Sequence, residues 1–154
     1  MSDWVILASN LVSFDHAATQ HKVLLTRDYL SRPELFRGMR PNIINLSRSY
    51  TYQSRGYYAS LLAAARGQRV IPSVETIIDL SARKLYENAL PELEDALNKA
   101  HLDDEEAPAR FRIFFGMNRD PRLERFSRLI FDWFRAPILE VAIKRGQWLT
   151  ISRI

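Results

Sequence analysis

The side chains best suited to hold a ligand are concentrated in segment 47–57. The guanidinium groups of Arg48 and Arg55 match carboxylate or phosphate oxygens, the serine hydroxyls can donate hydrogen bonds, and the tyrosine rings can line a site or stack on a ligand. The residues that we select as candidate ligand-binding or anion-binding groups are Ser47, Arg48, Ser49, Tyr50, Tyr52, Gln53, Ser54, Arg55 and Tyr57. A purely structural interpretation stays open, in which Ser54 caps a helix, the tyrosines cover a sheet and the arginines are solvated.

The elements predicted on either side of this segment place it between a strand and a helix. An apolar run at 42–46 is typical of a buried strand, and the apolar stripe that begins at Tyr58 has helical spacing. Gly67 follows that helix, and a second β-prone run occupies 68–71, so the whole stretch has the size of a βαβ unit. Segment 47–57 would then lie at the carboxyl end of a strand and at a helix N-terminus, where anions bind readily.

Other catalytic patterns are missing from the sequence. It has no cysteine, no glycine-rich dinucleotide or P-loop motif and no nucleophile elbow. We interpret His16 and His21 as loop residues, and the adjacent acids at 103–106 as a solvated connection. We therefore predict no catalytic residues, no metal site and no cofactor within residues 1–154.

Composition sets the broad class of protein. The chain has 154 residues, of which 47% are hydrophobic and 26% charged, which predicts a single globular domain. No apolar run is long enough to span a membrane, and the N-terminus does not resemble a signal peptide, so we expect a cytoplasmic protein without a membrane partner. The net charge is +4, and arginines are enriched from Arg27 to Arg69. Such a face could meet an anionic small molecule, RNA or an acidic protein, although nucleic-acid binders usually carry denser basic patches.

Strand and helix patterns alternate along the chain. Strands are expected at 3–8, 22–26, 42–46, 68–71, 110–116, 138–143 and 148–154. Helices are expected from 58, from 81 and from 121, with Pro91 opening a further helix, while 73–80 could belong to either class. We predict a mostly parallel α/β sheet of Rossmann-like type, with helices on both faces and a C-terminal antiparallel hairpin; an α+β fold is the alternative.

A family resemblance is carried by three runs, NLSRSY, YQSRGYY and SLLAAARG, which lie between Asn45 and Gly67. Pro72-Ser73, Phe114-Phe115-Gly116 and the aromatic run 129–134 add to it. The sequence resembles the N-terminal domain that precedes RimK-like ATP-grasp ligases, in which we would expect Cys where this chain has Ser47.

The resemblance implies a fold like that of the domains that precede ATP-grasp modules. It also implies a ligase module C-terminal to this domain, which uses ATP and Mg²⁺ to activate a carboxylate as an acyl phosphate and to join it to an amine. ATP and Mg²⁺ would belong to that module, and residues 1–154 would form a single accessory domain that docks against it or supports substrate binding.

Two further hypotheses come from the residues. One is a free-standing module that binds RNA or an acidic partner through the arginine-rich face. The other is a small enzyme acting on an anionic metabolite. Association with a second copy of the chain is left open.

Overall fold

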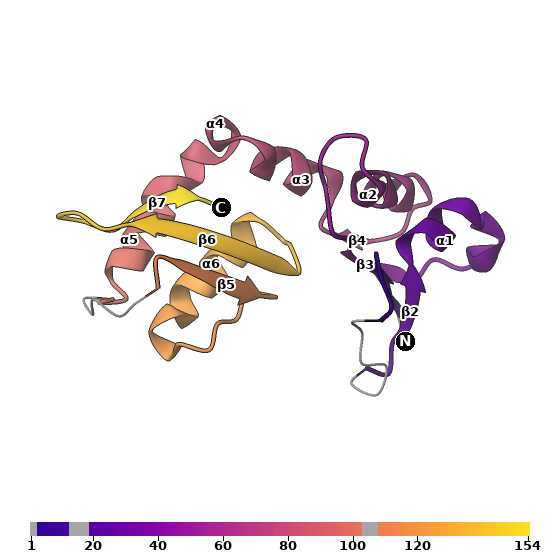
Figure 1. Cartoon of the computed structure of the whole chain (residues 1–154), viewed down its shortest axis with the longest axis horizontal. Coiled ribbons are helices and arrows are strands. Elements are labelled where there is room, and N and C mark those ends of the chain that lie inside the picture. The colour runs from indigo at the N-terminus through magenta and orange to yellow at the C-terminus, as the bar shows by residue number, and fades with distance from the viewer. Residues whose placement is uncertain (1–2, 13–18, 103–107) are drawn as a thin grey trace. The chain divides into compact units, whose positions relative to one another are not determined.

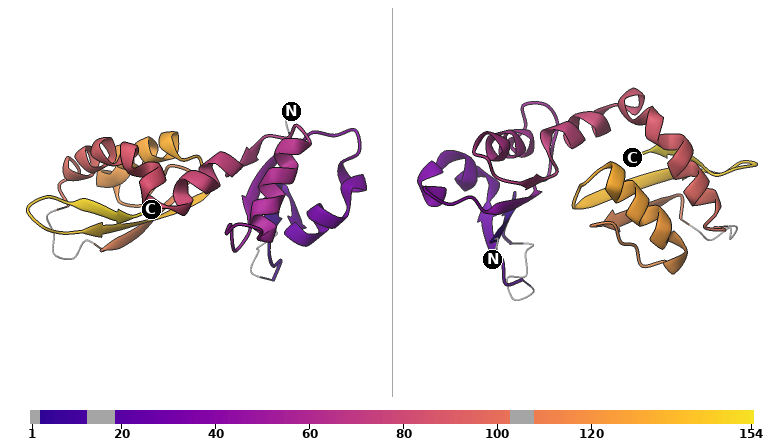
Figure 2. Two further views of the ribbon diagram at one scale, coloured as in Figure 1. Left: turned by 90° about the horizontal axis from the view of Figure 1, so that it is seen from above. Right: turned by 180° about the vertical axis from the view of Figure 1, so that it is seen from behind.

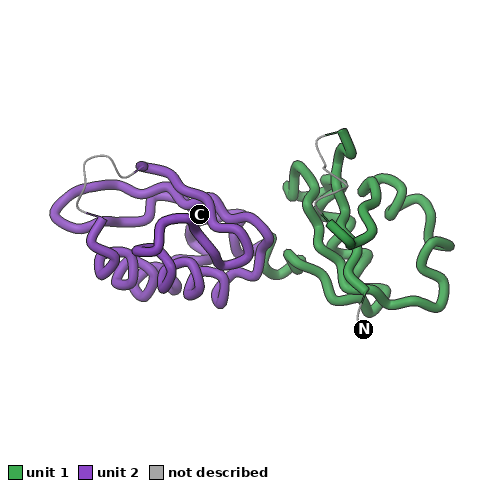
Figure 3. Tube along the Cα trace, turned by 90° about the horizontal axis from the view of Figure 1, so that it is seen from below, with its two compact units in different colours: residues 1–77 green, residues 78–154 purple. Residues whose placement is uncertain are grey.

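The computed structural model describes residues 3–12, 19–102 and 108–154 (Figure 1). The chain forms two compact units, residues 1–77 and 78–154 (Figure 3). Each unit has its own sheet and its own cluster of buried apolar side chains. The length of the chain led us to expect one domain with one core, whereas the buried side chains divide between these two units.

The first unit contains a parallel four-stranded sheet with the strand order β2-β1-β3-β4. Its strands are β1 (Trp4–Ala8), β2 (Lys22–Leu25), β3 (Asn42–Leu46) and β4 (Val70–Ile71). Because the strands are parallel, their C-terminal ends meet at one edge of the sheet, which we call the carboxyl edge; the opposite edge is the amino edge.

The helices of the first unit are α1 (Thr26–Ser31), the 3₁₀ helix η2 (Pro33–Phe36) and α2 (Arg55–Ala65). The connections β2-α1-η2-β3 and β3-α2-β4 cross the sheet in the same direction, so right-handed crossovers place α1 and α2 on the same face. The buried cluster agrees, because it joins Tyr29 of α1 and Ala59 of α2 to Val5, Leu7 and Ile43 of the sheet.

Two details of the first unit differ from our expectation. We predicted helices on both faces of the parallel sheet, but α1 and α2 share one face, because both connections advance in the same direction along the sheet. Helix α1 itself was not predicted. It has only six residues, and no side chain caps its N-terminus, so the usual start signal is missing.

The second unit contains an antiparallel sheet with the order β5-β6-β7, formed by β5 (Arg110–Phe114), β6 (Ile138–Lys144) and β7 (Thr150–Arg153). Strands β6 and β7 form the C-terminal hairpin that the sequence predicted. The run 110–116 was expected as a strand, and β5 within it is an edge strand of the antiparallel sheet. Its alternating burial, with Phe111 and Ile113 inside, is typical of such half-covered sheets.

The remaining helices all follow β4 in the chain. They are α3 (Val74–Ser81), α4 (Arg83–Tyr86), η3 (Glu87–Ala89), α5 (Leu90–Asn98), η4 (Pro121–Leu123) and α6 (Glu124–Trp133). Pro91 lies in the first turn of α5, as predicted, and Asp120 caps η4 through Arg122 N–H. Helices α5 and α6 cover one face of the antiparallel sheet (Figure 2).

The chain is thus a mixed α/β protein, as predicted from the alternating pattern. No helix in the described part of the chain is long and apolar enough to cross a bilayer. His16 and the acids at 103–106 lie outside the described residues, so the interpretation of both as loops stays a prediction.

Substituting Ile130 tests the core of the second unit. The Ile130 side chain has no exposed surface and lies in α6, within the cluster that joins the helices to the sheet. Ile130→Ala is expected to lower the free energy of unfolding by about 2–5 kcal/mol, measured by urea denaturation. Leu85→Ala is the control, because Leu85 is half exposed, and equal losses in the two variants would contradict the assigned core.

Candidate functional site

Segment 47–57 is anchored by a cap at the start of α2. Ser54 Oγ accepts a hydrogen bond from Tyr57 N–H at 3.2 Å and donates one to the carbonyl oxygen of Ser49 at 3.0 Å. The capping role predicted for Ser54 is therefore confirmed. Gln53, just before the cap, has a φ of 65°, a left-handed conformation that turns the chain into the helix.

Gly56 allows the segment to pack against the helix. A Cβ atom at this position would lie 2.1 Å from the carbonyl oxygen of Ser49 and 2.8 Å from Ser47 Cβ. No side chain fits there without movement of the backbone. The glycine is thus required by the close approach of segment 47–57 to the first turn of α2.

A chain of buried hydrogen bonds runs beneath the segment. Ser47 Oγ donates its only proton to Asn45 Oδ1 at 2.6 Å. Thr26 Oγ1, 2.9 Å away, must therefore be the donor of the hydrogen bond between Thr26 and Ser47. Asn45 Nδ2 donates to the carbonyl oxygen of Gly56 at 2.8 Å and to Ser60 Oγ at 2.9 Å. Ser60 Oγ in turn donates to the Pro72 carbonyl oxygen at 2.7 Å.

We call this set of hydrogen bonds the Asn45 network. It connects the start of α1, the end of β3, the start of α2 and the residue after β4. Ser47 is almost fully buried, and its hydroxyl is used within the network. That position in the structure favours a structural role for Ser47 over the ligand contact that we considered from the sequence.

Tyr50 also serves the fold. Its hydroxyl donates to the carbonyl oxygen of Asn45 at 2.5 Å, and burial raises the pKa of the phenol. Ser49 Oγ lies 3.1 Å from Thr51 Oγ1 in an exposed turn. The hydroxyls of Tyr50 and Ser49 therefore each have a partner within the protein.

The remaining candidates face solvent. Arg48, Gln53 and Arg55 are exposed, and the described residues place no ion pair on either arginine. The Tyr52 side chain is 76% exposed, and its ring meets the edge of Tyr57 at a centroid distance of 5.4 Å. Segment 47–57 thus turns the hydroxyls of Ser47 and Tyr50 inward, and its guanidinium groups and the Tyr52 ring outward.

A hollow of about 340 Å³ opens at the carboxyl edge, close to this surface. We call it the carboxyl-edge hollow; it is lined by Ser9, Asn10, Leu11, Val12, Leu25, Thr26, Arg27 and Arg55. Of the predicted site residues only Arg55 lines it. Arg27 also forms a weak ion pair, with its Nε 3.8 Å from Asp28 Oδ1.

Sequence reasoning missed most of this lining. Ser9 and Asn10 follow β1, and Thr26 and Arg27 follow β2, whereas our attention was on the end of β3. The signal that could have found them is the rule that the ends of neighbouring parallel strands share one edge. It requires the strand order, in which β1 lies between β2 and β3.

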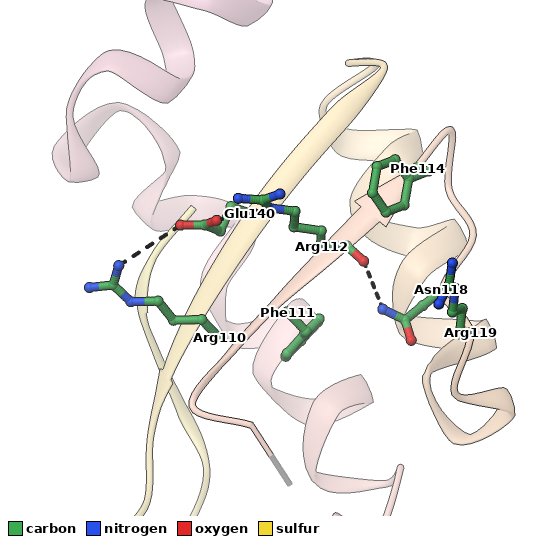
Figure 4. A pocket seen from close by; sticks show the side chains of 7 residues that line it. All are labelled: Arg110, Phe111, Arg112, Phe114, Asn118, Arg119 and Glu140. Carbon is green, nitrogen blue, oxygen red and sulfur yellow. Dashed lines mark hydrogen bonds and ion pairs between the residues drawn. The ribbon is translucent and has the colours of Figure 1, made fainter. Parts of the chain in front are cut away.

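Another hollow, of about 450 Å³, lies on the second sheet (Figure 4). Arg110 and Arg112 line it, but their guanidinium groups lie 3.9 Å and 3.1 Å from the carboxylate of Glu140. Asn118 Nδ2 is engaged with the Arg112 carbonyl oxygen at 2.7 Å. Glu140 thus occupies two of the three arginines that line this hollow, and the third is Arg119.

The arginines between 27 and 69 do not form one face. Arg27, Arg48 and Arg55 follow β2, follow β3 and begin α2, so they belong to the carboxyl edge. The others follow α1 or α2 or precede β3 or β4, at the amino edge: Arg32, Arg37, Arg40, Arg66 and Arg69. No group of three or more His, Cys, Asp or Glu side chains within the described ranges is placed to hold a metal ion.

Gly56→Ala tests the close approach of segment 47–57 to α2. Alanine usually stabilises a helix relative to glycine by up to about 1 kcal/mol. Here its Cβ would collide with the Ser49 carbonyl oxygen, so we expect a net loss of about 1–3 kcal/mol in thermal or urea unfolding. Gly146→Ala is the control, because its nearest neighbour, the Trp148 carbonyl oxygen, is 3.8 Å away; a stabilised Gly56→Ala variant would contradict the packing.

Tyr50→Phe tests the buried phenol by its dependence on pH. Because burial raises the folded-state pKa, Tyr50 contributes stability that is complete below pH about 10, the pKa of an unfolded tyrosine, and is lost as the pH rises above it. Tyr29 contributes in the same direction. Tyr50→Phe should reduce the alkaline slope of the unfolding free energy by up to about 1.4 kcal/mol per pH unit. The exposed control Tyr52→Phe should keep the wild-type slope, and an unchanged slope in Tyr50→Phe would contradict the burial.

Comparison with known proteins gave one result. The family model described as the RimK-like ATP-grasp N-terminal domain matches residues 26–154, which include α1, segment 47–57 and the whole second unit. Searches of curated proteins and of solved structures gave no significant match. The match covers most of the chain and agrees with the resemblance carried by Asn45–Gly67, so the chain belongs to the RimK-like ATP-grasp N-terminal domain family.

Proposed function

We propose that this chain is a non-catalytic N-terminal accessory domain of a cytoplasmic ATP-grasp ligase that joins a carboxylate to an amine. The observation that carries the proposal is the family match over residues 26–154, since the family is described by its position before an ATP-grasp domain. In this proposal the partner is an ATP-grasp module or subunit. We assign ATP and Mg²⁺ to that module, as membership of a domain family that precedes ATP-grasp modules implies.

The carboxyl-edge hollow is the part of the domain that we propose to support substrate binding. Its two guanidinium groups, from Arg27 and Arg55, can form charge-assisted hydrogen bonds with the carboxylate or acyl-phosphate oxygens that such a ligase handles. Arg55 is also the first residue of α2, where the positive end of the helix dipole favours an anion. Neither arginine takes part in the Asn45 network, and the long Arg27–Asp28 ion pair leaves other N–H groups of Arg27 for a ligand.

A free-standing module that binds RNA or an acidic partner remains the alternative. The exposed Tyr52 ring, in the same segment as the exposed Arg48 and Arg55, favours it, because aromatic and guanidinium groups together can stack on bases. The division of the arginines between two edges counts against one continuous polyanion track. Binding that falls steeply with salt and is lost in Tyr52→Ala would favour this alternative.

The main test combines this chain with the ATP-grasp module encoded in the same reading frame or beside it. Complex formation is measured by calorimetry, and ATP turnover is measured against carboxylate concentration. The double variant Arg27→Gln/Arg55→Gln should raise KM for the carboxylate about 10-fold or more, because two charge-assisted hydrogen bonds are lost. Docking of the module should be retained.

Arg69→Gln is the matched control, because Arg69 is an exposed arginine of the same unit at the amino edge. It should leave KM unchanged. The accessory role would be refuted by a gene neighbourhood that encodes no ATP-grasp module, or by a module whose binding and turnover are the same with and without this chain. An unchanged KM in the double variant would refute the substrate role of the hollow alone.

A further inference from the structure

A third cavity, of about 420 Å³, lies at the amino edge of the parallel sheet. We call it the amino-edge cavity; its lining consists of Pro33, Phe36, Gly38, Met39, Arg40, Arg66 and Gln68. These residues come from η2, the turn before β3, and the end of α2. None of them lines the carboxyl-edge hollow, so the two places are distinct.

Gln68 presents a buried hydrogen-bond donor to this cavity. Its side chain is only 5% exposed, and its Oε1 accepts a hydrogen bond from the Tyr29 hydroxyl at 2.6 Å. Tyr29 is fully buried, which raises the pKa of its phenol and keeps the donor proton in place. This hydrogen bond fixes which end of the amide is Oε1 and leaves the Nε2 group as the donor. No acceptor within the described residues bonds to Nε2.

Arg66 adds a positioned cation. Its guanidinium carbon lies 4.8 Å from the centroid of the Tyr29 ring, and Nη1 contacts the Tyr29 carbonyl oxygen at 3.4 Å. These contacts hold the side chain over a rigid surface and leave other guanidinium N–H groups available. Tyr29 therefore orients both Gln68 and Arg66.

Arg40 is the second cation. Its Nη1 lies 3.7 Å from the place where a Cβ of Gly67 would stand, so the guanidinium passes over this glycine. No ion pair within the described ranges involves Arg40. Gly67 has a φ of 68° and ends α2, which is why a residue without a side chain stands there.

The polar side chains of the lining are all oriented as donors. Arg40, Arg66 and the Gln68 amide offer N–H groups, and no acidic side chain lines the cavity. Near the end of α2, the carbonyl groups of Leu62, Ala63 and Ala64 accept hydrogen bonds from the N–H groups of residues 66–68. A donor-only lining suits an oxyanion and gives a ligand ammonium group no side-chain acceptor.

The rest of the lining is apolar, with Pro33, Phe36 and Met39. The volume lies within the range of about 300–1,000 Å³ that is usual for small-molecule sites. We propose that the amino-edge cavity binds a small organic anion whose carboxylate or phosphate group contacts Arg40, Arg66 and Gln68, and whose apolar body packs on Phe36 and Met39. This site does not depend on the proposed ligase function.

Calorimetry on the chain by itself tests the site with four probes. Phenylacetate and phenyl phosphate carry the oxyanion and an apolar body, inorganic phosphate carries the oxyanion only, and benzyl alcohol carries the apolar body only. One of the first two should bind saturably, and at least about 10-fold more tightly than inorganic phosphate and benzyl alcohol. The comparison between the first two distinguishes a carboxylate ligand from a phosphate ligand.

Arg40→Gln should weaken the tighter probe at least about 10-fold, since it removes one charge-assisted contact. Gln68→Glu should do the same, because it replaces the N–H donors by a carboxylate oxygen while keeping an acceptor for Tyr29. Arg37→Gln is the matched control, an exposed arginine near the same edge that does not line the cavity, and it should bind like the wild type.

Absence of saturable binding by both organic anions up to about 10 mM, a concentration at which millimolar affinity would still be measured, would overturn the proposal. So would wild-type affinity in Arg40→Gln, a variant of an exposed side chain that is expected to fold normally even where Gln68→Glu does not. Loss of binding in Arg27→Gln/Arg55→Gln but not in Arg40→Gln would place the ligand at the carboxyl edge. That result would refute the amino-edge site and leave the proposed ligase role intact.

Discussion

One buried amide, Asn45, holds the carboxyl edge of the first unit together. Its Oδ1 accepts from Ser47, and its Nδ2 donates to the Gly56 carbonyl oxygen and to Ser60. A buried amide that loses a partner costs about 1–3 kcal/mol for each unsatisfied group, so the positions of β3, α2 and segment 47–57 are coupled. Thr26 extends the coupling to the start of α1. Every element that borders the carboxyl-edge hollow except the loop after β1 is joined through this network.

The hydrogen bonds within the first unit give several polar residues of segment 47–57 a structural role. A hydroxyl that donates its proton to an acceptor within the protein cannot also donate it to a ligand. Ser47, Ser54 and Tyr50 each donate in this way. What segment 47–57 offers to solvent is charge and aromatic surface, from Arg48, Arg55 and Tyr52. The structure therefore separates positioning from binding within one short stretch of chain.

Local signals predicted the elements that are specified locally. Strand β3 has the predicted bounds, Ser54 caps α2 and Pro91 opens α5, because each depends on a few neighbouring residues. The run 110–116 was predicted as a strand, but its pattern does not identify its partner, which is β6 in the antiparallel sheet. The candidate site shows the same division. Arg55 could be predicted as a cation close to a helix start, whereas its proximity to Arg27 depends on the strand order, which the sequence does not give. Side-chain patterns specify burial, and strand order is decided by packing over the whole unit.

The division of the arginines between two edges has an electrostatic consequence. A five-residue strand such as β3 is roughly 17 Å long, about twice the Debye length of about 8 Å at physiological ionic strength. An anion at Arg27 and Arg55 is therefore screened from one at Arg40 and Arg66, and neither repels the other appreciably. A polyanion, by contrast, would have to extend across the full length of the strands to neutralise both groups. The two anion sites that we propose would therefore act independently of each other, whereas an extended partner would have to bridge both edges of the sheet.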